Sequence, residues 1–164
     1  MIIADVLYDV FFAAVAGVGF GAISNPPLKA FFSIAVLSAI GHGIRFCLMH
    51  YAGLDIAPAS LVGAISIGGG SFVAGKLIRC PMTVLSIPSL LPMVPGIFAY
   101  KTIFALIMFL GSTGHPGSEA SYLQMFWSNF LIAFATTFNL AIGAILPHLI
   151  FREKALSLTR RRRT

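Results

Sequence analysis

The sequence predicts an all-α fold: a polytopic membrane protein with five transmembrane helices, the fourth of them broken by proline and glycine. Hydrophobic residues make up 58% of the 164 residues, charged residues make up 10%, and the mean hydropathy is +0.94. This composition lies outside the usual range of soluble globular domains. The apolar residues also gather in runs close to the ~20 residues that a helix needs to cross a bilayer.

Five apolar runs are expected to cross the membrane, at about residues 4–24, 28–51, 57–75, 82–110 and 122–150. Turn sequences separate them: "SNPP" after the first run, "GLD" after the second, "RCP" after the third and "GSTGHPGSE" after the fourth. We therefore expect a membrane domain over residues 1–151, followed by a basic cytoplasmic tail over residues 152–164.

The cations of the predicted loops indicate the orientation, because Lys and Arg accumulate on the cytoplasmic side. With five spans, Lys29, the pair Lys76 and Arg79, and the basic tail all fall on one side. The opposite side then carries the carboxylates Asp5, Asp9, Asp55 and Glu119. With four spans, obtained by treating the second run as a surface segment, Lys29 and the Lys76/Arg79 loop fall on opposite sides. Five spans are therefore preferred, with the N-terminus outside and the C-terminus in the cytoplasm.

The fourth run contains the most unusual feature of the sequence, "SIPSLLPMVPGIFAYK". Pro88, Pro92 and Pro95 each remove a backbone donor, and Gly96 follows the last of them. Backbone groups freed in this way must face protein or a water-filled cavity. Transporters use such broken helices at mid-membrane to bind solutes. We favour that interpretation over a proline kink that only shapes helix packing.

Polar residues inside the second and fourth runs are candidates for solute binding. His42 and Arg45, in "AIGHGIRF", are three residues apart and share one face of a helix. Counted from the middle of each run, Arg45 and Lys101 lie at a similar depth, about 8 Å toward the outer side. With no carboxylate of the chain expected beside them, the two cations suit an anionic solute. In the alternative, both side chains extend outward to lipid headgroups.

The fifth run carries a polar stripe, Asn129, Thr136 and Asn139, that is expected to face the protein interior. Most of this stripe is predicted to form hydrogen bonds between helices, although contact with a solute is the alternative. Small residues in the first and third runs, including Gly17 and the "SIGGGS" segment at 66–71, predict faces on which helices pack closely.

Enzymatic chemistry has little support in the sequence. Hydrolysis within a membrane needs paired carboxylates, a nucleophile with a base, or metal ligands at fixed spacing, and we find none of these patterns. We expect neither a cofactor nor a metal. The terminal "TRRRRT" is interpreted as a topology anchor at anionic lipid headgroups and not as a nucleic-acid site.

Two motifs together resemble a known transporter family. "GHGIR" at residues 41–45 and "PMVPGIFAY" at residues 92–100, in that order, resemble the small membrane subunit of the threonine/serine exporter family, the YjjB-like half. The resemblance implies secondary transport of small carboxylate-bearing solutes, threonine and serine or a dicarboxylate such as succinate. It also implies a multi-pass protein of the bacterial inner membrane that works with a larger membrane subunit, which explains cations without intramembrane carboxylates to balance them.

The sequence therefore gives a leading hypothesis and one alternative. The leading hypothesis is a transporter subunit that binds a carboxylate near the broken helix, in a complex for which a higher oligomer is one alternative. The alternative is an assembly or stability subunit that does not itself contact the solute. The candidate substrate-binding or path residues are His42, Arg45, Pro92, Pro95, Gly96, Tyr100, Lys101, Asn129 and Asn139. The solute, the coupling ion and the oligomeric state stay open.

Overall fold

The computed structural model describes residues 2–112 and 116–150, and all its regular elements in these ranges are helices. In chain order they are α1 (Ile2–Ile23), α2 (Leu28–Tyr51), α3 (Ile56–Ile78), α4 (Met82–Leu90), the 3-10 helix η1 (Leu91–Met93), α5 (Gly96–Gly111) and α6 (Pro116–Ile150). The predicted all-α fold is confirmed. The predicted basic tail lies outside the described residues.

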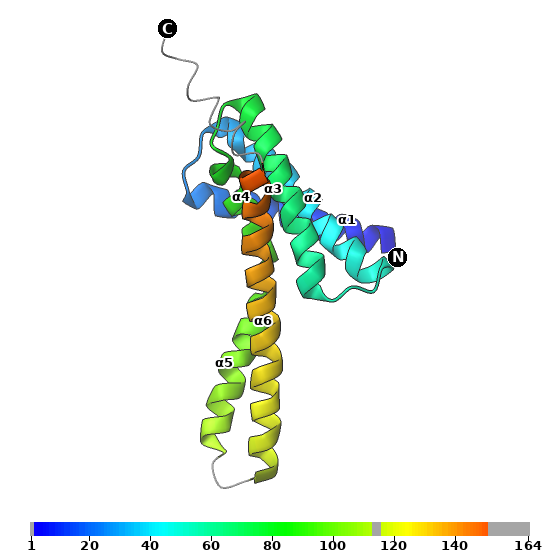
Figure 1. Ribbon diagram of the computed structural model, residues 1–164, viewed down its shortest axis with the longest axis vertical. Helices are drawn as coiled ribbons and strands as arrows, with labels where there is room; N and C mark the ends of the chain where they lie inside the picture. The colour runs from blue at the N-terminus through cyan, green and yellow to red at the C-terminus, as the bar shows by residue number, and fades with distance from the viewer. Residues whose placement is uncertain (1, 113–115, 151–164) are drawn as a thin grey trace.

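The helices form a packed body with a projecting arm (Figure 1). In the body, α2 packs against α1 and α3, and α4 packs against all three of these helices. The C-terminal half of α6 lies along α3, while its other half extends away from the body with α5 beside it (Figure 1). With 35 residues, α6 is roughly 52 Å long at ~1.5 Å per residue, so it connects the body and the arm.

Glycines allow the body helices to cross at short range. A Cβ added to Gly63 of α3 would lie 2.8 Å from the carbonyl oxygen of Gly41 on α2. A Cβ added to Gly143 of α6 would lie 2.9 Å from the carbonyl oxygen of Leu61 on α3. Any larger residue at these positions would push two backbones apart.

The predicted small-residue faces are confirmed in large part. Gly17 packs against Ser38 where α1 meets α2, and a Cβ on Gly68 would lie 3.0 Å from the carbonyl oxygen of Ala144 on α6. Gly69, by contrast, faces open space, with nothing within 4 Å of a built Cβ. The "GGG" sequence therefore combines glycines at helix contacts with one that has no packing constraint.

This difference allows a matched test of the helix crossing. Gly63→Ala should lower the free energy of unfolding by about 1–3 kcal/mol, because the added methyl group overpacks the α2–α3 contact. Gly69→Ala adds the same methyl group to the same helix without a clash and should be neutral or slightly stabilising. Thermal unfolding in detergent, monitored by circular dichroism, measures the stability of both variants. Equal melting temperatures for the two variants would contradict the tight crossing.

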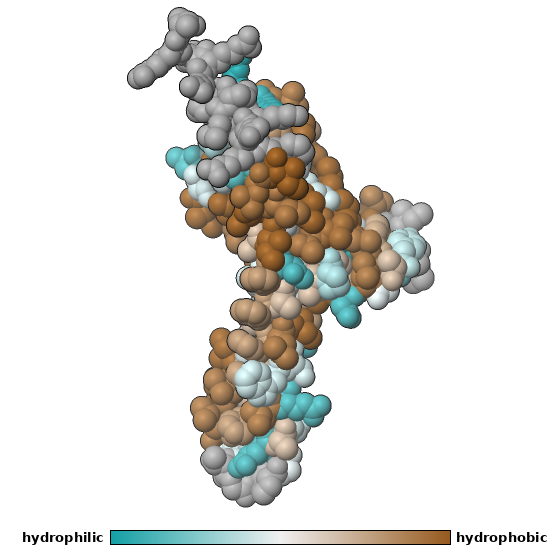
Figure 2. All heavy atoms as spheres, viewed as in Figure 1, coloured by the Kyte–Doolittle hydropathy of each residue, from teal (hydrophilic) through white to brown (hydrophobic). Residues whose placement is uncertain are grey.

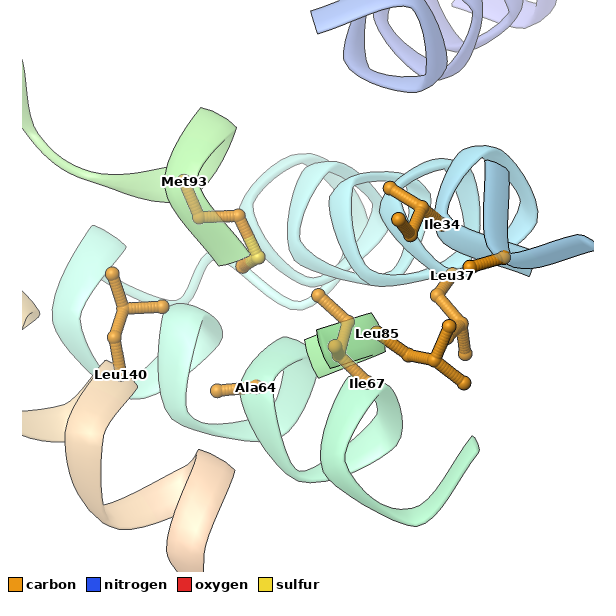
Figure 3. Close-up of a cluster of buried hydrophobic side chains, with 8 residues drawn as sticks. Ile34, Leu37, Ala64, Ile67, Leu85, Met93 and Leu140 are labelled. Carbon is orange, nitrogen blue, oxygen red and sulfur yellow. The ribbon is translucent and has the colours of Figure 1, made fainter. Parts of the chain in front are cut away.

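The hydrophobic core lies next to the break in the fourth span. It joins α2, α3, α4, η1 and α6 through the buried residues shown in Figure 3: Ile34, Leu37, Ala64, Ile67, Leu85, Met93 and Leu140. Met93 of η1 is fully buried among them. The core therefore fixes the backbone of η1 against the body, next to α2.

Large apolar side chains are exposed on every long helix, and they dominate the face shown in Figure 2. Such a surface requires an apolar solvent. Four helices are long and apolar enough to cross a membrane, and the bent pair Met82–Met93 and Gly96–Gly111 makes a fifth when counted as one span. The chain is thus a polytopic membrane protein. Compared with the predicted spans, the first helix begins two residues earlier and the last begins at Pro116.

The break predicted in the fourth span is present. The two helical segments on either side of residues 94 and 95 are bent by 53° relative to each other. Pro95, with φ −79° and ψ 63°, is the central residue of an inverse γ-turn, in which the N–H of Gly96 donates to the carbonyl of Val94 at 2.8 Å. The γ-turn redirects the chain from the body into the arm.

Candidate functional site

The break leaves two backbone carbonyls in need of hydrogen-bond donors. In a continuous helix, the carbonyl of Pro92 would accept from the N–H three or four residues later. Pro95 has no N–H, and the N–H of Gly96 is used by Val94. The next carbonyl, that of Met93, also lies at the end of η1. An apolar environment requires that both oxygens find partners elsewhere.

Two side chains of α2 supply these partners. His42 Nε2 lies 3.0 Å from the carbonyl oxygen of Pro92, and Arg45 Nη1 donates to the carbonyl oxygen of Met93 at 3.0 Å. The predicted sharing of one helix face by His42 and Arg45 is confirmed, since both reach the same break. The structure therefore joins the two sequence motifs that lie about 50 residues apart in the chain.

A carboxylate of the first helix completes the cluster. Asp9 Oδ2 lies 3.0 Å from His42 Nδ1, so α1, α2 and η1 meet at one imidazole ring. The expectation that the chain places no carboxylate beside its intramembrane cations is wrong. Asp9 lies seven residues into α1, about 10 Å along the helix at ~1.5 Å per residue, and so reaches deeper than a residue at the membrane boundary.

The three side chains differ in exposure. His42 is 7% exposed, and the Asp9 side chain is 30% exposed. Arg45 is partly buried, and its Nη2 lies 3.4 Å and 3.3 Å from the two ring nitrogens of His42. These almost equal distances place Nη2 over the ring face rather than along one nitrogen lone pair.

Arg45 retains donors for an anion. A guanidinium carries five N–H groups in a planar fork, and the hydrogen bond to Met93 uses one of them. The contact of Nη2 with the His42 ring involves a second nitrogen. The remaining N–H groups can bind a carboxylate, and a bidentate contact is the geometry that guanidinium favours.

The other candidate residues lie at different places. Pro95 is buried at the break and Gly96 is exposed beside it. Tyr100 and Lys101 are exposed on α5, where the Tyr100 ring stacks on Phe104. Among the described residues, α5 packs along α6 and not along α2, the helix that carries Arg45. The structure therefore does not bring the two cations together through direct contact.

The two asparagines of α6 make hydrogen bonds to backbone carbonyls. Asn139 donates to the carbonyl of Ala57 at 2.9 Å and thereby ties α6 to the first turn of α3. Asn129 donates to the carbonyl of Met125 on its own helix at 2.7 Å. Asn139 therefore makes the predicted contact between helices, whereas Asn129 lies on the arm and bonds locally. Thr136 is fully buried.

Comparison with known proteins places this arrangement in a family. The family model described as "Threonine/Serine exporter, ThrE" matches residues 9–150. This chain belongs to the threonine/serine exporter family. The match begins at Asp9 and includes every other member of the cluster around the break. The resemblance to the threonine/serine exporter family, inferred from the two motifs, is confirmed.

A relative in Haemophilus influenzae, described as an uncharacterized protein, is 30% identical to the chain over 150 residues. The aligned region covers 90% of this chain and 48% of the relative, so the chain spans about half the length of the curated relative. No solved structure matches the chain.

Proposed function

We propose that this chain is the small subunit of a secondary transporter that exports small carboxylate-bearing solutes, threonine and serine or a dicarboxylate such as succinate. The observation that carries the proposal is the position of Arg45, whose guanidinium lies at the mid-span break with N–H groups left over after its bond to Met93. Membership of the exporter family supplies the transport class. The guanidinium supplies a group that recognises what these solutes share, a carboxylate.

The solute path is proposed to pass the break. His42, Arg45 and Pro92 meet there, and the γ-turn at Pro95 and Gly96 opens toward α5. Beyond this point the proposed path residues are on the arm and on α6: Tyr100, Lys101, Asn129 and Asn139. Exposed polar groups on the arm suit a path that is completed by another subunit.

The partner is proposed to be a larger membrane subunit of the same family. The relative is about twice as long as the region that it shares with this chain, so one chain of the relative contains a further segment that this chain would obtain by association. The arm formed by α5 and the first half of α6 extends away from the body (Figure 1), and its apolar and aromatic side chains are exposed. Such a surface is available to a helical partner as well as to lipid.

Export from loaded cells tests the proposal. Cells that lack this chain should lose export of labelled threonine, serine or succinate, and restoring it together with the larger neighbouring membrane protein should restore export of at least one of them. An unchanged efflux of all three solutes in the absence of the chain would contradict the proposed function.

The second candidate, a non-transporting assembly or stability subunit, is favoured by one observation. His42 and Arg45 cap the carbonyls of Pro92 and Met93, which is a structural role that needs no solute. In that case, variants at either residue that still assemble with the partner would transport normally. Transport by such assembled variants therefore separates the two candidates.

We further propose that the protein lies in the bacterial inner membrane with its N-terminus outside and its C-terminus in the cytoplasm, because the loop cations gather on one side. A cysteine placed at Ser118, in the first turns of α6, should react with an impermeant thiol reagent in intact cells. A cysteine at Ser157, in the predicted tail, should react only after permeabilisation. Labelling of both positions from one side would contradict the orientation.

A further inference from the structure

The His42 ring lies between two hydrogen-bond acceptors. Its Nε2 faces the carbonyl oxygen of Pro92, and its Nδ1 faces the carboxylate oxygen of Asp9, both at 3.0 Å. A carbonyl oxygen can only accept, and so can an ionised carboxylate. A neutral imidazole has one N–H and one bare nitrogen, so it cannot satisfy both contacts.

The geometry therefore requires one additional proton. Either His42 is an imidazolium that donates from both nitrogens, or the carboxyl group of Asp9 carries the proton and donates to Nδ1. In both forms the pair of side chains holds one proton more than a carboxylate next to a neutral histidine. We infer that the Asp9–His42 pair is a proton-binding site, and that the bound proton decides whether the break in the fourth span stays attached to α2.

Loss of the proton breaks one specific hydrogen bond. The single N–H left on the ring can donate to the carboxylate of Asp9 or to the carbonyl of Pro92, and the bond to the ionised carboxylate is the stronger of the two. The ring then keeps Nδ1–H toward Asp9 and presents a bare Nε2 to the carbonyl of Pro92. Two acceptors repel each other at this distance, so the backbone at Pro92 separates from α2, while the buried Met93 keeps its bond to Arg45. The proton goes to water.

Arg45 favours the same outcome. Its Nη2 lies 3.3 Å from Nε2 and is the donor nearest to the bare nitrogen. Once Pro92 has moved away, Nη2 can shift from the ring face into the plane of the imidazole, and its donation to Nε2 satisfies the ring without Pro92. The carbonyl of Pro92 then becomes available at the break, beside the N–H groups of Arg45 to which the solute is proposed to bind.

The charged and titratable groups around the ring are few. Helix α1 contributes Asp9, and α2 contributes Arg45. η1 contributes only the two carbonyls, and α4 contains no titratable residue in its sequence. The one titratable residue of α3, Lys76, contacts the Phe72 ring in the last turns of that helix. The Asp9 side chain is more exposed than that of His42, 30% against 9%, so we place proton exchange on the Asp9 side.

The proton site rests on hydrogen-bond geometry, and only its use as a coupling site rests on the proposed transport function. The test therefore measures the conformation of the break without transport. A nitroxide label at Val94→Cys reports the mobility of the break, because Val94 directly follows η1 and is exposed. Cys47→Ser and Cys80→Ser remove the native thiols. The full-length chain is measured in lipid nanodiscs by electron paramagnetic resonance.

Raising the pH from about 5 to about 9, a range that includes histidine titration, should narrow the spectrum as the break is released. Asp9→Asn should abolish the narrowing, because the amide N–H of asparagine donates permanently to Nδ1 and leaves Nε2–H on Pro92 at both pH values. Asp5→Asn, one turn earlier on the same exposed helix end, should leave the pH-dependent narrowing unchanged. A label at Leu77→Cys on α3 should show no pH effect.

His42→Gln provides a second variant, in case Asp9→Asn assembles poorly. Glutamine can donate to Pro92 but does not titrate in this range, so its spectrum should also be independent of pH. A wild-type spectrum at position 94 that is the same at both pH values would overturn the inference. Narrowing that persists in Asp9→Asn or in His42→Gln would overturn it as well. Neither result depends on whether the complex exports a carboxylate.

Discussion

Replacing Arg45 with lysine is expected to weaken the apparent affinity of the assembled transporter for its carboxylate solute by about ten-fold or more. A guanidinium can hold Met93 with one N–H and still bind a carboxylate with two others. A lysine ammonium has three donors on a single nitrogen and a shorter side chain. It must therefore give up the Met93 carbonyl to bind the solute carboxylate, or the reverse. A lost charged hydrogen bond is worth roughly 1.5–3 kcal/mol. Concentration-dependent transport by the variant, at normal abundance and with its partner, measures the effect.

Lys101→Gln provides the comparison for this prediction. It removes the second candidate cation, which lies exposed on α5, so we expect a smaller loss of affinity than for Arg45→Lys. If Arg45 only extended to lipid headgroups, lysine would replace it with little effect, since lysine extends in the same way. Unchanged affinity in both variants would contradict the carboxylate site and favour the assembly-subunit alternative.

The number and kind of the helices could be predicted because bilayer length and turn composition act locally. Each apolar run, and the proline-rich break, is visible in a short window of sequence. The start of α6 is harder to predict from the sequence. The segment before residue 122 contains Gly117, Ser118 and Glu119, which indicate a loop, but the helix begins at Pro116. Proline is favourable at a first helical position, whereas the polar composition of this segment favours a loop.

The candidate site could be predicted only in part. The pairing of His42 with Arg45 follows from their spacing on one helix, and the need of the break for donors follows from its prolines. Their meeting is a tertiary contact, which helical spacing does not give. The sequence predicts a boundary position for Asp9 because it lies near the end of an apolar run. Asp9 could have been found by a general rule. An ionisable residue inside an apolar helix is by default a functional candidate.

The position of Lys101 relative to Arg45 could not be predicted from its depth in the membrane alone. Counting residues from the middle of each span places Lys101 level with Arg45, but depth says nothing about rotation around the helix or about the lateral position of the helix. The 53° bend at residues 94 and 95 carries α5 away from α2 and along α6. A broken span therefore invalidates the assumption of a straight helix on which the comparison of depths depends.

Reconstituted alone in lipid vesicles, the chain is expected to show no uphill transport of threonine, serine or succinate. It contains the proposed proton site at Asp9 and His42 and the proposed carboxylate-binding group at Arg45, but it corresponds to about half the length of its relative. A cycle of alternating access needs two parts that move against each other around the site, and the body of this chain supplies one. Vesicles that contain the chain with its larger neighbour should accumulate solute when a pH gradient is imposed.

The matched control in these vesicles is Asp9→Asn in the same complex. The variant keeps a hydrogen-bond donor at the position of the carboxyl group, but it does not exchange a proton. If the pair couples the gradient, the complex should lose uphill transport and retain solute exchange at equal concentrations, because exchange needs the binding site and not the proton. Robust uphill transport by the isolated chain would show that the second subunit is not required. Full uphill transport by the Asp9→Asn complex would assign coupling to another site and leave the carboxylate contact of Arg45 to be judged by affinity alone.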